Sequence, residues 1–241
     1  LYIVDSRQAF HLRQIFAVSR AAGLAPEDCS LEHHPFGTIL GKDGRPFRTR
    51  AGGTVKLMDV LEEAEQRAFD LVSEKSADLP EEQRRQIARV VGIGSVKYAD
   101  LSLNRTTDYI FDWDRMLSFD GNTAPYLQYS YVRVQSIFRR GELDEAAPQG
   151  DILIAEPAEK RLAVLLSQFA EAVEQVAGDC YPNVLCGYLY DLAEAYMKFY
   201  ESCPVLKSAE PVRTSRLLLC LLTARTIRTG LGLLGIETVE R

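Results

Sequence analysis

The chain lacks the patterns that define several common protein classes. Its five cysteines are an odd number and include no Cys-x-x-Cys pair, so neither a zinc site nor a disulfide framework is indicated. No Gly-Lys-Ser/Thr ends its glycine-rich stretch, which argues against a P-loop NTPase. There is no basic-then-apolar leader and no apolar run long enough to span a bilayer. We therefore expect a protein with free thiols in a reducing cytoplasm that contacts no membrane.

Size and charge leave the function open. With 241 residues and 46% hydrophobic content, the chain can bury a substantial core as one large domain or two small ones. A formal charge of −6 argues against unspecific nucleic-acid binding, so any RNA contact has to come from local clusters of cations. One cluster follows Pro211, where no acid occurs before Ile236. A solvated face balanced by acidic neighbours explains each of its arginines equally well.

A tyrosine-rich segment opens one of the predicted helices. An Asn-Thr pair can cap this helix, and a proline fits its first turn, where a missing N–H costs nothing. Tyr126, Tyr129 and Arg133 then fall on one helical face. Such a face suits stacking on nucleotides, although for each tyrosine taken singly the core of a bundle is the commoner explanation. Part of a second tyrosine-rich run, residues 181–200, has the spacing of a core stripe: positions 188, 192 and 196 fall at i, i+4 and i+8.

A basic glycine-rich loop, Gly41–Lys56, holds five cations and one anion and precedes an amphipathic helix. Glycines allow backbone N–H groups to turn toward an oxyanion, and the following helix adds the positive end of its dipole. The loop therefore indicates phosphate binding. A solvated surface turn is the alternative for such a loop in isolation.

Taken together, these segments resemble the arginyl-tRNA synthetase family of class I synthetases. The resemblance runs over essentially the whole chain, and its motifs occur in the family's order. The matching segments are Asp5–Gln8 with His11, Phe47–Gly53, Asp108–Asp114, Thr123–Tyr126 and Gly235–Glu240.

The chain also departs from the family pattern. It contains no His-x-Gly-His, the first class I signature, and it opens on the apolar run Leu1–Val4. The resemblance therefore implies the C-terminal part of a longer enzyme, which is not expected to catalyse alone. Its mobile loop carries Phe-Arg-Thr-Arg where class I enzymes have Lys-Met-Ser-Lys-Ser. The family often ends in methionine, so one residue beyond Arg241 is expected.

The fold implied by the resemblance is α/β followed by all-α. Residues 1–118 correspond to the end of a Rossmann-type catalytic domain with the mobile ATP loop and connecting helices, and residues 119–241 to a helical-bundle anticodon-binding domain. Sequence periodicity predicts a short buried strand at 2–4, a strand at 31–36 and an exposed loop at 141–150. It predicts helices at 8–22, 57–74, 80–103, 159–176, 182–201 and 211–234.

The resemblance implies activation of arginine by ATP, followed by transfer of the arginyl group to the 3′ end of its tRNA. Partners are then arginine tRNA, arginine and ATP with Mg²⁺, with no permanently bound cofactor or metal site, in a monomeric cytoplasmic protein. Cations on a closing loop stabilise the charge that develops on departing pyrophosphate, and this assigns catalytic roles to Arg48 and Arg50.

The remaining site residues are also expectations. Gln8 matches the glutamine that contacts the substrate guanidinium, with capping of its own helix as the alternative. The expected ATP-binding residues are His11, Arg48, Thr49, Arg50, Gly52 and Gly53. The expected tRNA-binding residues are Tyr126, Tyr129, Arg133, Arg225 and Arg228.

Two other functions remain open. A non-catalytic tRNA-binding adaptor would share the helical domain without forming an adenylate. Another class I synthetase, such as a cysteinyl enzyme, has a similar anticodon domain, but the lack of zinc-ligand spacing and the Arg-Thr-Arg loop argue against it.

Overall fold

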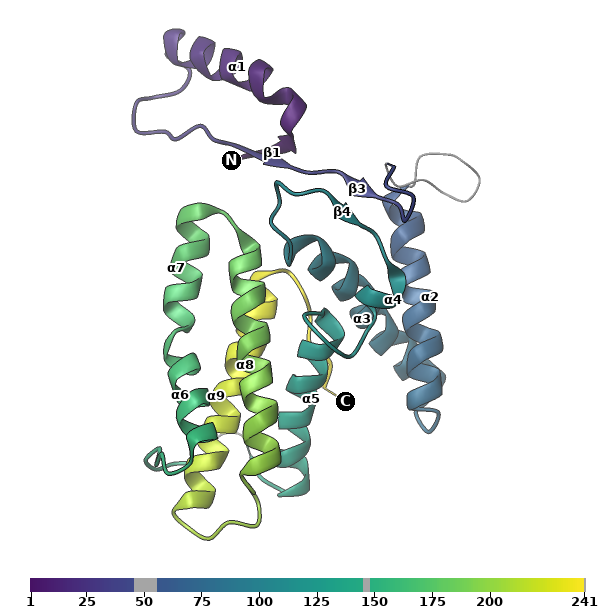
Figure 1. Cartoon of the computed structure of the whole chain (residues 1–241), viewed down its shortest axis with the longest axis vertical. Helices are drawn as coiled ribbons and strands as arrows, with labels where there is room; N and C mark the ends of the chain where they lie inside the picture. The colour runs from purple at the N-terminus through teal and green to yellow at the C-terminus, as the bar shows by residue number, and fades with distance from the viewer. Residues whose placement is uncertain (46–55, 145–147, 241) are drawn as a thin grey trace. The chain divides into compact units, whose positions relative to one another are not determined.

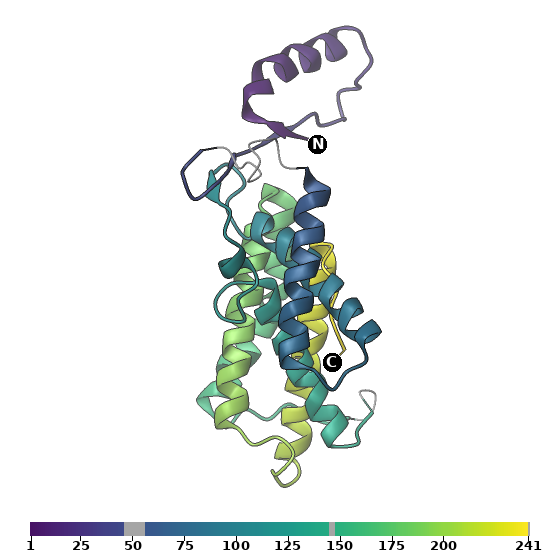
Figure 2. The same cartoon turned by 90° about the vertical axis from the view of Figure 1, so that its right-hand side faces the viewer.

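The computed structural model describes residues 1–45, 56–144 and 148–240. The chain divides into two compact units. Unit 1 comprises Leu1–Val55 with Leu103–Asp112, and unit 2 comprises Lys56–Ser102 with Trp113–Arg241. Figures 1 and 2 show the small α/β arrangement of unit 1, purple to blue with its 103–112 segment in teal, and the long helices of unit 2.

Unit 1 contains two short parallel sheets. Strand β1 (Tyr2–Asp5) pairs with β2 (His33–Phe36), and the chain between them forms a 3-10 turn, η1 (Ser6–Gln8), and helix α1 (Ala9–Ala21). A parallel pair requires such a crossover. The second sheet pairs β3 (Ile39–Leu40) with β4 (Tyr109–Ile110). The predicted strand–helix–strand order is confirmed.

The predicted burial of the first strand is wrong. Tyr2 is 43% exposed and Ile3 65% exposed, and α1 leaves Phe10 and Val18 equally open to solvent at 65%. Parallel sheets are normally covered on both faces. A two-stranded sheet with one helix has too little material for that, so Leu12 is the one buried residue of α1.

Unit 2 is helical. A hairpin of α2 (Leu57–Lys75) and α3 (Glu81–Leu101) packs closely, because a Cβ added at Gly92 would lie 2.7 Å from the backbone of Ala64. Helix α3 also packs against the bundle, through α5 and α8. The remaining helices are α4 (Trp113–Met116), α5 (Ala124–Arg140), α6 (Pro157–Ser167), α7 (Phe169–Asp179), α8 (Pro182–Ser202) and α9 (Val212–Leu233).

Helix α5 begins as its sequence predicts. The Thr123 hydroxyl accepts a hydrogen bond from the backbone N–H of Tyr126 at 3.3 Å, and Pro125 lies in the first turn. A threonine cap satisfies one of the free N–H groups of a helix start. This fixes the residue at which the tyrosine-rich face starts.

The helix predicted at 159–176 is in fact two helices. The Gln168 N–H bonds to the carbonyl of Leu165 at 3.0 Å, and the Tyr188 hydroxyl donates to the same oxygen at 2.8 Å. That carbonyl is thereby shared with a side chain of α8, so the chain tightens after Ser167 and restarts as α7. The break depends on a residue far along the sequence.

All five cysteines are free. Cys186, Cys203 and Cys220 are buried, whereas Cys29 is exposed. Burial raises the pKa of the Cys186 thiol to about 12. Within the described ranges, no helix is both long and apolar enough to cross a membrane.

Candidate functional site

Five side chains of unit 2, two cations and three aromatic rings, form a continuous series of contacts. The Lys75 ammonium lies 5.2 Å from the centroid of the Phe119 ring, which meets Tyr129 edge-on at 6.3 Å. The Arg133 guanidinium lies 5.3 Å from the Tyr129 centroid and 4.7 Å from that of Tyr200. We call Lys75, Phe119, Tyr129, Arg133 and Tyr200 the cation–aromatic ladder.

The helices position the ladder. On α5, Tyr129 and Arg133 are one turn apart, so the guanidinium lies over the neighbouring ring. Tyr200 comes from the last turn of α8, and Lys75 ends α2. Arg133 is thus placed between rings of two helices.

Part of the ladder is open to solvent. Tyr129 is 40% exposed and Lys75 is exposed, while Arg133 is half-buried and approaches the Met197 sulfur at 3.9 Å. Each cation–ring contact contributes about 0.5–1 kcal/mol at such sites. Rings and guanidinium planes of this kind are the groups on which proteins stack unpaired bases. The geometry is therefore suited to single-stranded nucleic acid.

Tyr126 lies beside the ladder, on the same face of α5. Its ring is 5.7 Å from that of Tyr190, whose hydroxyl donates to Glu194 at 3.1 Å. Burial raises the pKa of Tyr126, and the Glu194 carboxylate raises it further. Negative charge around this ring favours contact with a neutral base over contact with a phosphate.

The arginines of α9 differ in their environments. Arg225 and Arg228 are exposed, and within the described part of the chain no contact joins either of them to the ladder. Arg213 lies 3.7 Å from the Glu210 carboxylate. Of the expected tRNA-binding residues, the structure brings together Tyr126, Tyr129 and Arg133.

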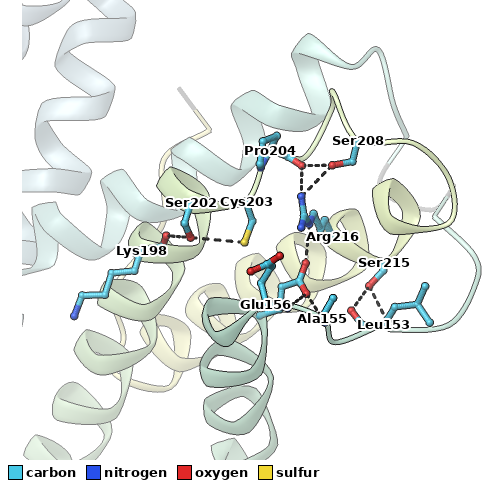
Figure 3. A network of polar contacts seen from close by, with 11 residues as sticks. Leu153, Ala155, Glu156, Lys198, Ser202, Cys203, Pro204, Ser208, Ser215 and Arg216 are labelled. Carbon is cyan, nitrogen blue, oxygen red and sulfur yellow. Dashed lines mark hydrogen bonds and ion pairs between the residues drawn. The ribbon is translucent and has the colours of Figure 1, made fainter.

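Arg216 is part of a buried ion pair (Figure 3). Its Nε donates to Glu159 at 2.7 Å, and its Nη1 donates to the Pro204 carbonyl at 2.8 Å and to the Ser208 hydroxyl at 3.0 Å. The other oxygen of Glu159 accepts the N–H groups of residues 155 and 156. Arg216 therefore joins α9 to α6 and to the loop after α8, and it is not available to a ligand.

The Glu159 carboxylate is held in its ionised form. Burial by itself would raise its pKa, but the two backbone N–H groups and Arg216 outweigh burial and lower the pKa. Hydrogen bonds to a charged carboxylate have this effect.

Gln8 and His11 lie in unit 1, and both are exposed. Gln8 makes no side-chain hydrogen bond that caps α1, so the capping alternative is wrong. The preceding turn is fixed instead by Asp5, which accepts the Arg7 backbone N–H at 2.8 Å and its guanidinium at 2.8 and 2.9 Å. The side-chain hydrogen bond from Arg7 lowers the pKa of Asp5 to about 2.

The start of the basic loop is a tight turn. The Gly44 N–H bonds to the Gly41 carbonyl at 2.9 Å, with Gly44 at a φ of 71° that favours glycine. Lys42 pairs with Asp112 at 3.1 Å. The other expected ATP-binding residues, Arg48, Thr49, Arg50, Gly52 and Gly53, lie outside the described residues.

Sequence reasoning missed three members of the ladder, namely Lys75, Phe119 and Tyr200. Tyr200 ends the second tyrosine-rich run, and the core-stripe spacing in that run gives no signal of a binding surface. Neither Lys75 nor Phe119 lies in a recognisable motif, so only the packing of α2 against the segment before α5 reveals them.

Comparison with known proteins finds one matching family for each half of the chain. Residues 1–113 match the family described as tRNA synthetases class I (R), catalytic domain, and residues 127–241 match the DALR anticodon binding domain. The chain is 58% identical over 241 residues to an arginine-tRNA ligase of Laribacter hongkongensis and 59% identical over 242 residues to one of Proteus mirabilis. All of this chain is covered in both cases, but it spans only 42% of the length of these relatives.

Solved structures give the same result. The arginyl-tRNA synthetase of Thermus thermophilus matches with a TM-score of 0.85 at 34% identity, over 99% of this chain and 40% of that one. The enzyme of Plasmodium falciparum matches with a TM-score of 0.84 at 28% identity, over all of this chain and 40% of that one. Because both halves of the chain and its whole fold agree with the same proteins, the chain belongs to the arginyl-tRNA synthetase family.

Proposed function

We propose that this chain is part of an arginine-tRNA ligase and that its helical domain, residues 119–241, binds the anticodon arm of arginine tRNA. The cation–aromatic ladder is the observation that carries the proposal. Residues 1–118 contribute the end of the catalytic domain and its mobile ATP loop. Substrates are arginine, its tRNA and ATP, with Mg²⁺ entering on the ATP phosphates.

We further propose that the ladder acts by stacking. Anticodon bases are unpaired and can be splayed onto ring and guanidinium faces, each stacked base contributing about 1–3 kcal/mol. Tyr126, Tyr129 and Arg133 are the proposed contacts, with Arg225 and Arg228 reaching the phosphate backbone from α9. The site of action is the cytoplasm, consistent with three buried free thiols, and the protein acts as a monomer.

In the catalytic half, we assign transition-state stabilisation to Arg48 and Arg50. Charge increases on pyrophosphate as it departs, so cations of a closing loop bind the transition state better than the ground state. Gln8 accepts a hydrogen bond from the guanidinium of arginine, and His11, Thr49, Gly52 and Gly53 contribute to the ATP site. Gln8 and His11 are exposed, as contact with a substrate requires.

Filter binding tests the anticodon role. Arg133→Ala and Tyr129→Ala should each weaken binding of an arginine tRNA transcript by about 5- to 150-fold, the equivalent of one stacked base. Arg161→Ala is the matched control, because Arg161 is an exposed arginine of α6 outside the ladder. A tRNA without its anticodon loop should bind all four proteins equally weakly. Unchanged affinity of both ladder variants, with circular dichroism intact, would exclude the proposal.

ATP–pyrophosphate exchange tests the catalytic role. In a protein of the relatives' full length, replacing Arg48 or Arg50 by alanine should slow exchange by about 10- to 1000-fold, because a transition-state contact is lost. Affinity for tRNA should stay the same. An unaltered exchange rate would contradict the assignment, and tRNA binding without any adenylate formation would instead identify a non-catalytic adaptor.

A further inference from the structure

The segment that follows α9, Gly235–Glu240, runs back beside α5 in Figure 1. We call it the strap. Lys97 of α3 donates to the Gly235 carbonyl at 2.6 Å, and Gln128 of α5 donates to the Glu237 carbonyl at 2.9 Å. Arg139 donates to the Glu240 carbonyl at 2.8 Å. Each of these side chains bonds to a strap carbonyl, so the strap is bound through its backbone to both helices.

Apolar side chains of the strap enter two different cores. Ile236 is 3% exposed and packs within the core of the bundle. Val239 packs instead on the core of the α2–α3 hairpin, against Ala68, Ala88 and Val91. Over a few residues, the strap thus joins the hairpin to the bundle.

The surface under the strap is shaped to receive it. A Cβ at Gly94 of α3 would lie 3.1 Å from the Ile236 side chain and 3.2 Å from the Gln128 amide. The absence of a side chain at that position lets Ile236 and Gln128 approach α3 together. Gln128 is 1% exposed, so its amide is enclosed between α3, α5 and the strap.

The ladder spans the same junction. Lys75 belongs to the hairpin, whereas Tyr129, Arg133 and Tyr200 belong to the bundle. On α5, the strap-binding residues Gln128 and Arg139 occupy a different face from Tyr129 and Arg133, given 100° per residue. Loss of the strap therefore removes no side chain of the ladder, yet it removes one of the contacts between the hairpin and the bundle, beside the direct packing of α3 on α5 and α8.

We propose that the strap is a positioning element for RNA binding: it holds the hairpin against α5 so that Lys75 and Phe119 stay in line with Tyr129 and Arg133. This inference rests on the proposed anticodon role of the ladder. The residues that carry it, Gln128 and Val239, act through the ladder.

Two strap variants test the inference in the full chain. Gln128→Leu removes the bond to Glu237 from a buried position that RNA cannot reach, and Val239→Ser weakens packing on the hairpin. Leu233→Ser is the matched control, because Leu233 is 59% exposed at the end of α9, outside the strap. Affinity for an arginine tRNA transcript is measured for each variant alone and combined with Arg133→Ala, and melting curves establish that each protein is folded at the assay temperature.

Both strap variants should raise the Kd about fivefold or more, whereas Leu233→Ser should leave it unchanged. When Arg133→Ala is already present, the strap variants should raise the Kd by a much smaller factor, because they weaken tRNA binding through the ladder. A merely structural strap would lower the melting temperature without this non-additivity. If Val239→Ser is unfolded, the double-mutant cycle of Gln128→Leu with Arg133→Ala tests the positioning role on its own.

Different results overturn the positioning role of the strap and the proposed function. Full affinity of the strap variants, or strictly additive losses, together with weakened binding by Arg133→Ala overturns the positioning role and leaves the proposed function standing. If Arg133→Ala binds as tightly as the unchanged protein, both the proposed function and the inference are overturned.

Discussion

Arg216 and Glu159 form a buried charge pair whose hydrogen-bonding groups are almost all satisfied. Both carboxylate oxygens are bonded, and Nε and Nη1 of the guanidinium have acceptors. Removing one partner of such a pair leaves the other charge buried and alone, which is costly. At the scale of the residue, Arg216 is therefore a structural cation, unlike the exposed arginines of α9, which are free to contact a ligand.

Glu159→Gln should lower the free energy of unfolding at pH 7 by about 3–5 kcal/mol. The pKa of Glu159 is lowered in the folded state, so its contribution is present above the unfolded pKa of about 4.3 and is lost as pH falls through the lower folded value. Stabilities of the original protein and the variant should therefore converge in acid. Urea unfolding between pH 7 and pH 3 measures this.

The control for that prediction is Glu81→Gln. Glu81 forms an exposed pair with Arg85 at 2.7 Å, and such pairs contribute about 0–1 kcal/mol. Equal losses of unfolding free energy for Glu81→Gln and Glu159→Gln would show that burial of the Glu159–Arg216 pair has no energetic consequence.

At the scale of the element, two glycines distinguish close packing from flexibility. Gly92 brings α3 against the backbone of Ala64 on α2, where an added Cβ would meet atoms at 2.7 Å. Gly187 in α8 has nothing within 4 Å. Gly92→Ala should destabilise by about 1–3 kcal/mol through overpacking, and Gly187→Ala should stabilise by about 0.5–1 kcal/mol. Thermal melts of both variants measure these changes in stability. A stabilising effect of Gly92→Ala would contradict the close contact between α3 and α2.

The helices were largely predictable, because apolar periodicity, the Thr123 cap and glycines such as Gly23 and Gly141 indicate where they lie and end. The break at Gln168 was not, since it depends on the Tyr188 hydroxyl reaching Leu165 from another helix. Local patterns carry no information about such distant donors.

The candidate site was likewise predictable only in part. One face of a helix is visible in the sequence, so Tyr126, Tyr129 and Arg133 could be grouped. Lys75 and Tyr200 reach the same surface from α2 and α8, and only tertiary packing brings them there. Burial of Arg216 was equally invisible, because its partner lies 57 residues away.

At the scale of the whole molecule, the two units should differ in stability. Among the described residues of unit 1, only Leu12 and Phe111 are buried, whereas α8 alone buries eight residues. Regions with few buried contacts open at low free energy. Amide hydrogen exchange in β1 and α1 should therefore be on the order of 100-fold faster, relative to intrinsic rates, than in α8. Uniform protection across the chain would contradict this.

Packing and proposed function divide the chain differently. The hairpin of α2 and α3 packs with α5 and α8, so it belongs to the larger unit. The boundary at 118/119 is a proposal about function: it separates the catalytic portion from the anticodon portion. Helices α2 and α3 are therefore assigned to the catalytic portion by function, although they pack in the same unit as the anticodon portion.

The five thiols differ in burial, so their reaction with a reagent reports on the opening of each unit. Cys29, exposed in unit 1, should couple to a maleimide within the ordinary reaction time, while Cys186 and Cys220 in the bundle core react only when it opens. Burial raises the pKa of Cys186 to about 12, so its reactive thiolate is scarce at neutral pH as well as inaccessible. A dye would couple first at Cys29 and more slowly at the half-buried Cys180, and the still later uptake of reagent by the buried thiols would time the opening of the bundle core.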